Sequence, residues 1–154
     1  MARLIFAVMY GEIDAFNKYK NSLLQKYGKI IAESPEYEFN FTDYYEEEFG
    51  TGLKKKILVF EKEINKEEIV GVKKEIGTLE GERGSRRINI DPGFVSKEGV
   101  FLASDKKGAF KEKLDGIFLH KVIGFTNGKT EVYKHTFADY RQEKIIKFFE
   151  SLLH

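Results

Sequence analysis

The chain has 154 residues, a length that suits one domain and buries about two thirds of the surface of the unfolded chain, so we expect a single globular domain over residues 1–154. Its 26 basic and 25 acidic residues leave a net charge of +1, which excludes a general nucleic-acid binder because such proteins need a basic excess. The chain has no cysteine, so we expect no disulfide, thiolate catalysis, iron–sulfur cluster or structural zinc, and we expect no haem either.

The first residues, MARLIFAVMYGEID, contain a short apolar run that soon meets acidic residues. This run is far too short to span a membrane and is unlike a signal peptide. We therefore predict a cytoplasmic protein that makes no membrane contact. Lys and Glu carry most of the charge, a bias that favours a thermophilic source.

Three elements are predicted in the first quarter of the chain. Residues 3–10 form a continuous apolar run, as expected of a strand covered on both faces. Residues 12–27 carry apolar side chains at spacings of three and four, which predicts a helix that Gly28 ends. Residues 35–41 alternate aromatic and polar side chains, which predicts a half-buried strand.

The middle of the chain predicts a further strand and helix. Residues 53–64 have an apolar centre between charged ends, as a sheet strand does. Asn65 with Glu68 resembles a capping box, so a helix is expected over residues 65–79. A charged loop at 80–87 follows, and the sequence Pro92-Gly93 predicts a turn.

The last third predicts strands and a final helix. Residues 99–104 read as a strand, and Asn127-Gly128 predicts a tight hairpin between two further strands because both residues accept positive φ angles. Residues 143–153 predict a terminal amphipathic helix.

This order of elements predicts an α+β fold. We expect a two-layer sandwich with a mostly antiparallel mixed sheet of six or seven strands and helices on one face, and a ferredoxin-like core is one such arrangement. A doubly wound parallel sheet is the alternative. It is disfavoured because the second half lacks helices between its strands.

Three polar segments lie where strands are predicted to end, and together they suggest a site. They are FTDYYEEEFG (41–50), RRINIDPG (86–93) and HTFADYR (135–141). If the three strand ends share one edge of the sheet, acids, arginines and tyrosines gather there.

These stretches resemble the signature segments of a family of small bacterial and archaeal proteins, known only as domain of unknown function family 4416. The matching pieces are FNFTDYYEEEFG, RRINIDPGF, LASDKK and TFADYR, in the same order along nearly the whole chain. The resemblance implies a shared site and no particular activity. Phe110 and Lys111 stand where the family pattern usually has a His-Arg pair, so a catalytic role of that pair would be lost here.

The predicted roles follow from side-chain chemistry, and each has a structural alternative. Hydroxyls, ring faces, basic groups and a further carboxylate are assigned to ligand binding: Thr42, Tyr44, Tyr45, Arg86, Arg87, Lys106, Asp139 and Arg141. Carboxylates are assigned as general bases or ligands of Mg²⁺ or Mn²⁺: Asp43, Glu48 and Asp91. The alternatives are a solvated acidic loop, strand alternation, ordinary charged turns and, at His120, a hydrogen-bonded strand histidine.

Two classes of function remain open. In the first, the protein binds an anionic small molecule, a phosphorylated metabolite or nucleotide, and the sequence leaves open whether it acts on this molecule as an enzyme. In the second, it is a non-catalytic interaction or self-assembly module whose aromatic segment contacts a partner. Polar residues of both signs at strand ends favour the first. The oligomeric state does not follow from the sequence.

Overall fold

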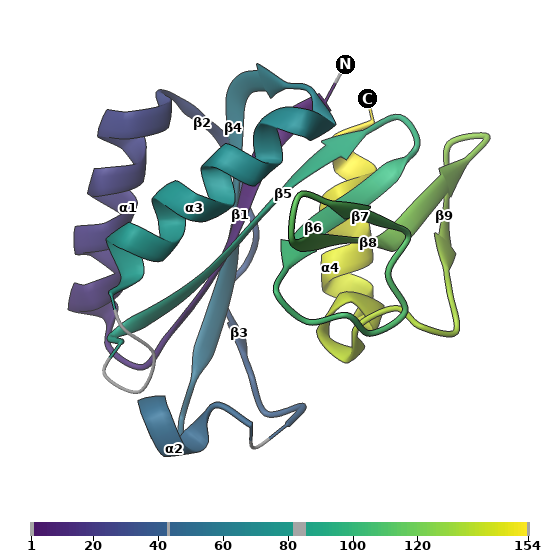
Figure 1. The fold of residues 1–154 in the computed structure, drawn as a ribbon. Coiled ribbons are helices and arrows are strands. Elements are labelled where there is room, and N and C mark those ends of the chain that lie inside the picture. Colours follow the sequence, from purple (N-terminus) through teal and green to yellow (C-terminus); the bar gives the residue numbers. More distant parts are fainter. Residues whose placement is uncertain (1, 43, 82–85, 154) are drawn as a thin grey trace.

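The structure is a computed structural model that describes residues 2–42, 44–81 and 86–153. In this part of the chain, nine strands form one antiparallel sheet (Figure 1). The strands are β1 (Ala2–Tyr10), β2 (Ile30–Glu33), β3 (Tyr37–Glu38), β4 (Lys54–Ile64), β5 (Ile88–Ser96), β6 (Gly99–Ser104), β7 (Glu112–Leu114), β8 (Ile117–Thr126) and β9 (Lys129–Val132). The helices are α1 (Ile13–Tyr27), α2 (Glu46–Phe49), α3 (Ile69–Glu80) and α4 (Glu143–Ser151), with 3-10 turns η1 (Lys66–Glu68) and η2 (Ala138–Arg141).

The first half of the chain forms a ferredoxin-like core, as the sequence predicted. Strands β1, β2, β4 and β5 lie in the order β2-β4-β1-β5, and each neighbouring pair is antiparallel. Helix α1 connects β1 to β2, and α3 connects β4 to β5, which gives the two split βαβ units of that fold. Strands β6, β8 and β7 extend the sheet beyond β5.

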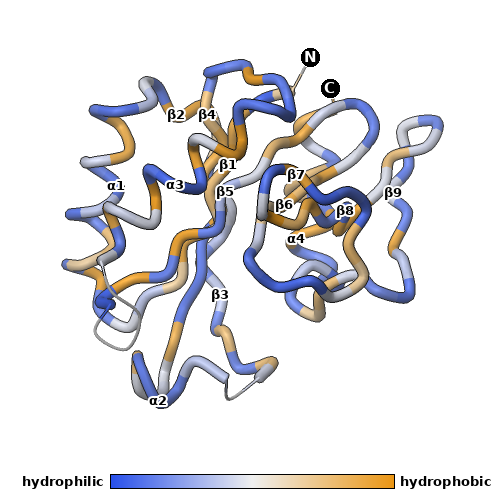
Figure 2. The backbone as a smooth tube through the Cα atoms, viewed as in Figure 1, coloured by the Kyte–Doolittle hydropathy of each residue, from blue (hydrophilic) through white to orange (hydrophobic). Residues whose placement is uncertain are grey.

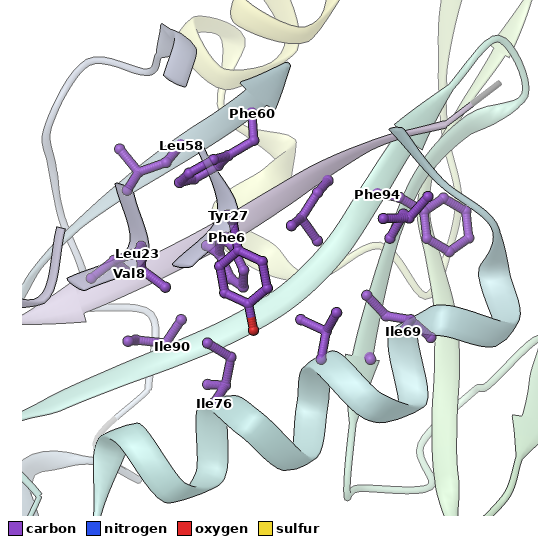
Figure 3. Close-up of a cluster of buried hydrophobic side chains, with 14 of the residues drawn as sticks. Phe6, Val8, Leu23, Tyr27, Leu58, Phe60, Ile69, Ile76, Ile90 and Phe94 are labelled. Carbon is purple, nitrogen blue, oxygen red and sulfur yellow. The ribbon is translucent and has the colours of Figure 1, made fainter. Parts of the chain in front are cut away.

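The α+β class is confirmed, but the helices cover both faces of the sheet. Helices α1 and α3 pack on one face, where Phe6 and Leu58 meet side chains such as Tyr27 and Ile76 (Figure 3). Helix α4 packs on the opposite face through Ile145 and Phe149. The sequence predicted helices on one face only. The difference has a physical cause, because β1 and the middle of β4 bury apolar side chains on both faces of the sheet. Figure 2 colours each residue of these strands by its hydropathy.

Two local predictions were wrong. The strand predicted over 35–41 is reduced to Tyr37–Glu38, which pairs with β4, and β2, which was not predicted, also pairs with β4. The predicted turn at Pro92-Gly93 lies inside β5. Pairing of β5 with β6 begins at Gly93, so the first five residues of β5 pair with β1 alone. Pro92, which has no N–H, is tolerated at such an open strand edge.

Other local predictions are confirmed. Asn65 and Glu68 form the capping box, with the Glu68 backbone N–H donating to Asn65 Oδ1 at 3.1 Å. Asn127 and Gly128 have φ angles of 53° and 76° in the hairpin between β8 and β9. Gly28, with φ of 96°, ends α1.

Candidate functional site

A cavity of about 470 Å³ lies where the first five residues of β5 are left unpaired by β6. The segment after β3 and the turn before α4, which lie toward the same end of the molecule in Figure 1, both contribute to its wall. The lining residues come from these segments, from β4, β5, β6 and β8, and from the loop after β6: Phe39, Phe41, Thr42, Tyr44, Tyr45, Lys55, Asp91, Leu102, Ala103, Ser104, Lys106, Gly108, His120, Phe137, Ala138 and Asp139.

Aromatic side chains form one wall of the cavity. The Tyr45 ring packs edge-on against Tyr44 and Phe39, with centroid distances of 4.9 and 5.9 Å, and Phe39 packs against Phe41 at 5.7 Å. Phe137 contributes from η2's N-terminal side and contacts the His120 ring at 5.5 Å. Such edge-to-face contacts hold the rings while leaving parts of their faces accessible.

A buried ion pair forms part of the cavity lining. Lys55 Nζ lies 2.8 Å from Asp139 Oδ2, and the Tyr37 hydroxyl donates to the same oxygen at 2.7 Å. Burial, together with the Asp139 charge, raises the pKa of Tyr37 well above its ordinary value, so Tyr37 remains a donor. The Lys55 ammonium also lies over the rings of Phe39 and Tyr140, at 5.0 and 5.2 Å. This lysine is therefore held by one carboxylate and two aromatic faces.

A second lysine lies at the exposed side of the cavity. Lys106 Nζ is 3.5 Å from the centre of the Tyr44 ring and 5.2 Å from that of Tyr45. Within residues 2–42, 44–81 and 86–153 no carboxylate lies within 4.0 Å of this ammonium. His120 Nε2 donates to the backbone carbonyl of Lys106 at 2.9 Å, and this bond ties the loop after β6 to β8.

The predicted ligand residue Arg86 is instead part of a buried network beside the cavity. Its Nε and Nη2 donate to the two carboxylate oxygens of Glu48, both at 2.8 Å, and its Nη1 donates to Asn89 Oδ1 at 2.9 Å. The Glu80 carboxylate lies 3.5 Å from Arg86 and accepts the backbone N–H of Ile90 at 2.6 Å. Burial raises the pKa of Glu80 to about 6, although the Ile90 hydrogen bond and nearby cations oppose the rise.

The other two predicted arginines also lie outside the cavity lining. Arg141 donates to the backbone carbonyls of Thr136 at 3.2 Å, Tyr133 at 2.5 Å and Lys134 at 3.0 Å. Arg87 is exposed and forms a 3.6 Å ion pair with Glu12, which is also exposed. Arg86 and Arg141 thus hold the chain segments that line the cavity, and Arg87 lies on the surface.

The structure brings together six of the predicted site residues and separates four others. Those that line the cavity are Thr42, Tyr44, Tyr45, Asp91, Lys106 and Asp139. Those that do not line it are Glu48, Arg86, Arg87 and Arg141. Asp43 lies outside the described residues.

Three lining residues with evident chemistry were not predicted as site residues: Lys55, His120 and Phe137. A signal for Lys55 was present in the sequence, because Lys55 shares the strand alternation of Ile57 and Val59, both of which are buried. Lys55 also pairs directly with Tyr37 across β3 and β4. Phe137 lies in the predicted segment 135–141, but its apolar side chain was not assigned a role there, and His120 carries no comparable local signal.

A larger cavity, of about 680 Å³, lies elsewhere, near the start of β1 and η1. Phe94, Phe101 and Leu119 line it, and an exposed Lys66–Glu112 ion pair at 2.8 Å lies among its lining residues. No signature segment contributes to it, apart from Phe94 at the end of one. The described residues contain no group of three or more His, Cys, Asp or Glu side chains placed to hold a metal ion.

The fold and cavity define an α+β protein with a ferredoxin-like core and an aromatic pocket at one open strand edge. The family model described as Domain of unknown function (DUF4416) matches residues 1–153. The chain therefore belongs to this family, as the signature segments predicted. No curated protein and no solved structure matches the chain. Among the described helices, none is long and apolar enough to cross a membrane.

Proposed function

We propose that the protein binds a small molecule that joins a planar ring to an anionic group, as a nucleotide or a phosphorylated aromatic metabolite does. One observation carries the proposal: a cavity of about 470 Å³ is walled by aromatic rings and has at its exposed side the ammonium of Lys106, which forms no ion pair with any residue that the structure describes. Ligand sites of this size commonly combine apolar walls with a few polar groups that orient the ligand.

Exposed aromatic side chains are the evidence that the ligand contains a planar ring. Tyr44 is 57% exposed and Phe137 is 37% exposed, and both line the cavity. Large exposed apolar groups beside a concave site mark a surface that a ligand covers. Stacking of one base on such a ring contributes about 1–3 kcal/mol to binding.

The charges of the residues that line the cavity are the evidence that the ligand contains an anionic group. Asp139 neutralises Lys55 inside the cavity, whereas the Lys106 ammonium contacts only aromatic rings among its described neighbours. A phosphate or carboxylate of the ligand would give this ammonium the charged hydrogen-bond partner that the described part of the chain does not supply.

The alternative from the sequence, an interaction or self-assembly module, would present its aromatic segment as a flat patch. The rings after β3 instead surround a hollow that the turn before α4 closes on another side. This arrangement favours a small ligand over a flat protein surface.

Catalysis and metal binding stay predictions. Of the two predicted catalytic carboxylates that the structure describes, Asp91 lines the cavity and Glu48 is held by Arg86. We therefore assign any acid–base role in this site to Asp91 rather than Glu48.

Thermal unfolding of the purified protein tests the proposal, because a ligand that binds only the folded state raises the midpoint temperature. The ligands are nucleoside monophosphates, the nucleosides without phosphate, and ribose 5-phosphate without a base. At least one monophosphate should raise the midpoint more than either of its parts does, since the cavity offers separate contacts to ring and anion.

Substitutions of two neighbouring lysines test whether the ligand binds in this cavity. Lys106→Ala should weaken binding of the best monophosphate about tenfold, because a charged hydrogen bond contributes about 1.5–3 kcal/mol. Lys107→Ala removes the neighbouring exposed lysine, which does not line the cavity, and should leave the affinity unchanged. Equal effects of the two substitutions, or a screen in which no monophosphate binds, would contradict the proposal.

A further inference from the structure

We propose that the ring of this ligand carries two neighbouring N–H donors, as the guanine base does, and that the Asp91 carboxylate accepts both. The inference rests on the proposed function and names the class of ring that the same cavity selects. Three observations carry it: the position of Asp91 in β5, its unused acceptor capacity, and the network that orients it.

The position of Asp91 is unusual for a carboxylate. Aspartate is depleted in strands, yet Asp91 lies inside β5, opposite Ala7 of the central strand β1. Its neighbours Ile88 and Ile90 are buried in the core under α1 and α3, so strand alternation places Asp91 on the other face, where it lines the cavity. A residue that opposes the local structural preference is expected at a functional position.

Among the residues that the structure describes, the Asp91 carboxylate has few hydrogen-bond donors. The hydrogen bond that it accepts there is a long one, from Asn89 Nδ2 to Asp91 Oδ2 at 3.4 Å. The nearby cations are already bound, because Arg86 faces Glu48 and Lys55 faces Asp139. A half-buried carboxylate in an aromatic cavity is costly without donors, so a ligand that supplies N–H groups gains from binding there.

Arg86 orients this carboxylate through Asn89. Arg86 Nη1 donates to Asn89 Oδ1 at 2.9 Å, and this bond leaves the Asn89 amide nitrogen directed to Asp91. A carboxylate held in one orientation pairs best with two parallel N–H groups. The edge of guanine has this arrangement, with the ring N–H beside the 2-amino group.

Other purines match the carboxylate less well. Hypoxanthine has the ring N–H without the amino group, and adenine places an unprotonated ring nitrogen beside its one amino group. Xanthine has a carbonyl oxygen where guanine has the amino group, so this oxygen would face the carboxylate. The wild-type protein should therefore bind GMP most tightly, IMP less tightly, and AMP and XMP weakest.

Calorimetric titration of the purified protein with these four monophosphates tests the inference. We expect GMP to bind at least about tenfold more tightly than AMP or XMP, the discrimination that a bidentate pair usually gives. Asp91→Asn replaces one acceptor by a donor, so this variant should prefer XMP to GMP. A reversal of preference is a result that simple loss of folding does not produce.

Asp115→Asn is the matched control, because Asp115 is exposed, lies outside the cavity lining and has a positive φ of 39° that asparagine tolerates. This variant should keep the wild-type order. Equal affinity for all four monophosphates, with no change in Asp91→Asn, would overturn the inference and leave the proposed function standing. A protein that binds none of the four nucleotides, nor any other planar phosphate, would overturn both. If Asp91→Asn does not fold, the order of the four affinities in the wild-type protein decides whether the inference holds.

Discussion

Charged side chains in and beside the cavity differ in how many ion pairs and hydrogen bonds they form with the rest of the protein. Lys55 is held by Asp139 and two rings, and Arg86 is held by Glu48 and Asn89. Lys106 and Asp91 have no such ion pair among the described residues. Of the charged residues that line the cavity, Lys55 and Asp139 thus bind each other, whereas Lys106 and Asp91 are left to face it.

The pKa of Glu80 predicts a dependence of stability on pH. In the folded protein this pKa is about 6, above the ordinary value of 4.5, so the folded state holds the proton more tightly than the unfolded chain. The contribution of Glu80 to the free energy of unfolding is therefore fully present below pH 4.5 and declines as the pH rises through 6. Between pH 4 and pH 7 the wild type should lose about 2 kcal/mol relative to Glu80→Gln.

Urea denaturation of both proteins at several pH values measures this difference. Glu80→Gln keeps an oxygen that can accept the Ile90 N–H, so both proteins should fold. A stability difference that stays constant from pH 4 to pH 7 would show that the Glu80 pKa is not raised.

At the scale of elements, two arginines hold two connections of the cavity wall in place by different means. Arg86 binds Glu48 of α2 and so ties the aromatic segment after β3 to the start of β5. Arg141 donates to the backbone carbonyls of Tyr133, Lys134 and Thr136. These bonds fix the turn that carries Phe137 and Asp139. Both clamps join residues that a loop separates.

Removal of the Arg141 clamp should lower stability. Arg141→Ala should reduce the free energy of unfolding by about 1–3 kcal/mol, because the three carbonyls lose a charged donor. Arg141→Lys should recover less than half of this loss, since a single ammonium cannot reproduce the planar fork of guanidinium. Urea denaturation monitored by circular dichroism gives these values.

Arg87→Ala is the matched control for this prediction. Arg87 makes only an exposed ion pair with Glu12, and such pairs contribute little, so its removal should change stability by less than about 0.5 kcal/mol. A loss in Arg87→Ala as large as that in Arg141→Ala would mean that the carbonyl contacts do not stabilise the turn.

At the scale of the whole molecule, β5 joins the ferredoxin-like core to the strands that extend it. The first part of β5 pairs with β1 alone, and pairing with β6 starts at Gly93. A Cβ atom at Gly93 would lie 2.0 Å from the Phe101 carbonyl oxygen of β6, so glycine allows the two strands to approach. The close approach at Gly93 therefore determines where β5 begins to pair with β6 and where the cavity begins.

Gly93→Ala should therefore be strongly destabilising, by about 3 kcal/mol or more, because β5 and β6 must separate to admit the methyl group. Gly71→Ala is the matched control, since Gly71 is exposed in α3 and a Cβ there meets nothing within 4 Å. It should raise the free energy of unfolding by about 0.5–1 kcal/mol. Thermal and urea denaturation of both variants would test the pair, and a mild effect of Gly93→Ala would contradict the close approach.

Local patterns predicted the elements that depend on neighbours in sequence. The capping box at Asn65, the hairpin at Asn127-Gly128 and the strand at β1 follow from spacing alone. Pro92-Gly93 was read as a turn because the same residues suit a turn and an open strand edge, and contact with Phe101 decides between them. Local sequence does not contain that contact.

The candidate site, like the fold, could be predicted from the sequence only in part. Polar residues at the ends of predicted strands indicated Asp91 and Asp139, which line one cavity although 48 positions separate them. The arginines were assigned to the ligand because fork geometry suits anions, but Glu48 and backbone carbonyls occupy two of the forks. Which acceptor an arginine meets depends on the tertiary fold.

The position of α4 has a consequence for synthesis of the chain. The central strands β1 and β4 carry Ile5, Ala7, Ile57 and Val59 on the face that α4 covers. A ribosome makes these strands well before residues 145–149, so this apolar face has no α4 over it until those residues have emerged. Nascent chains shorter than this should bind chaperones that recognise exposed apolar strands, and release should follow the arrival of Phe149.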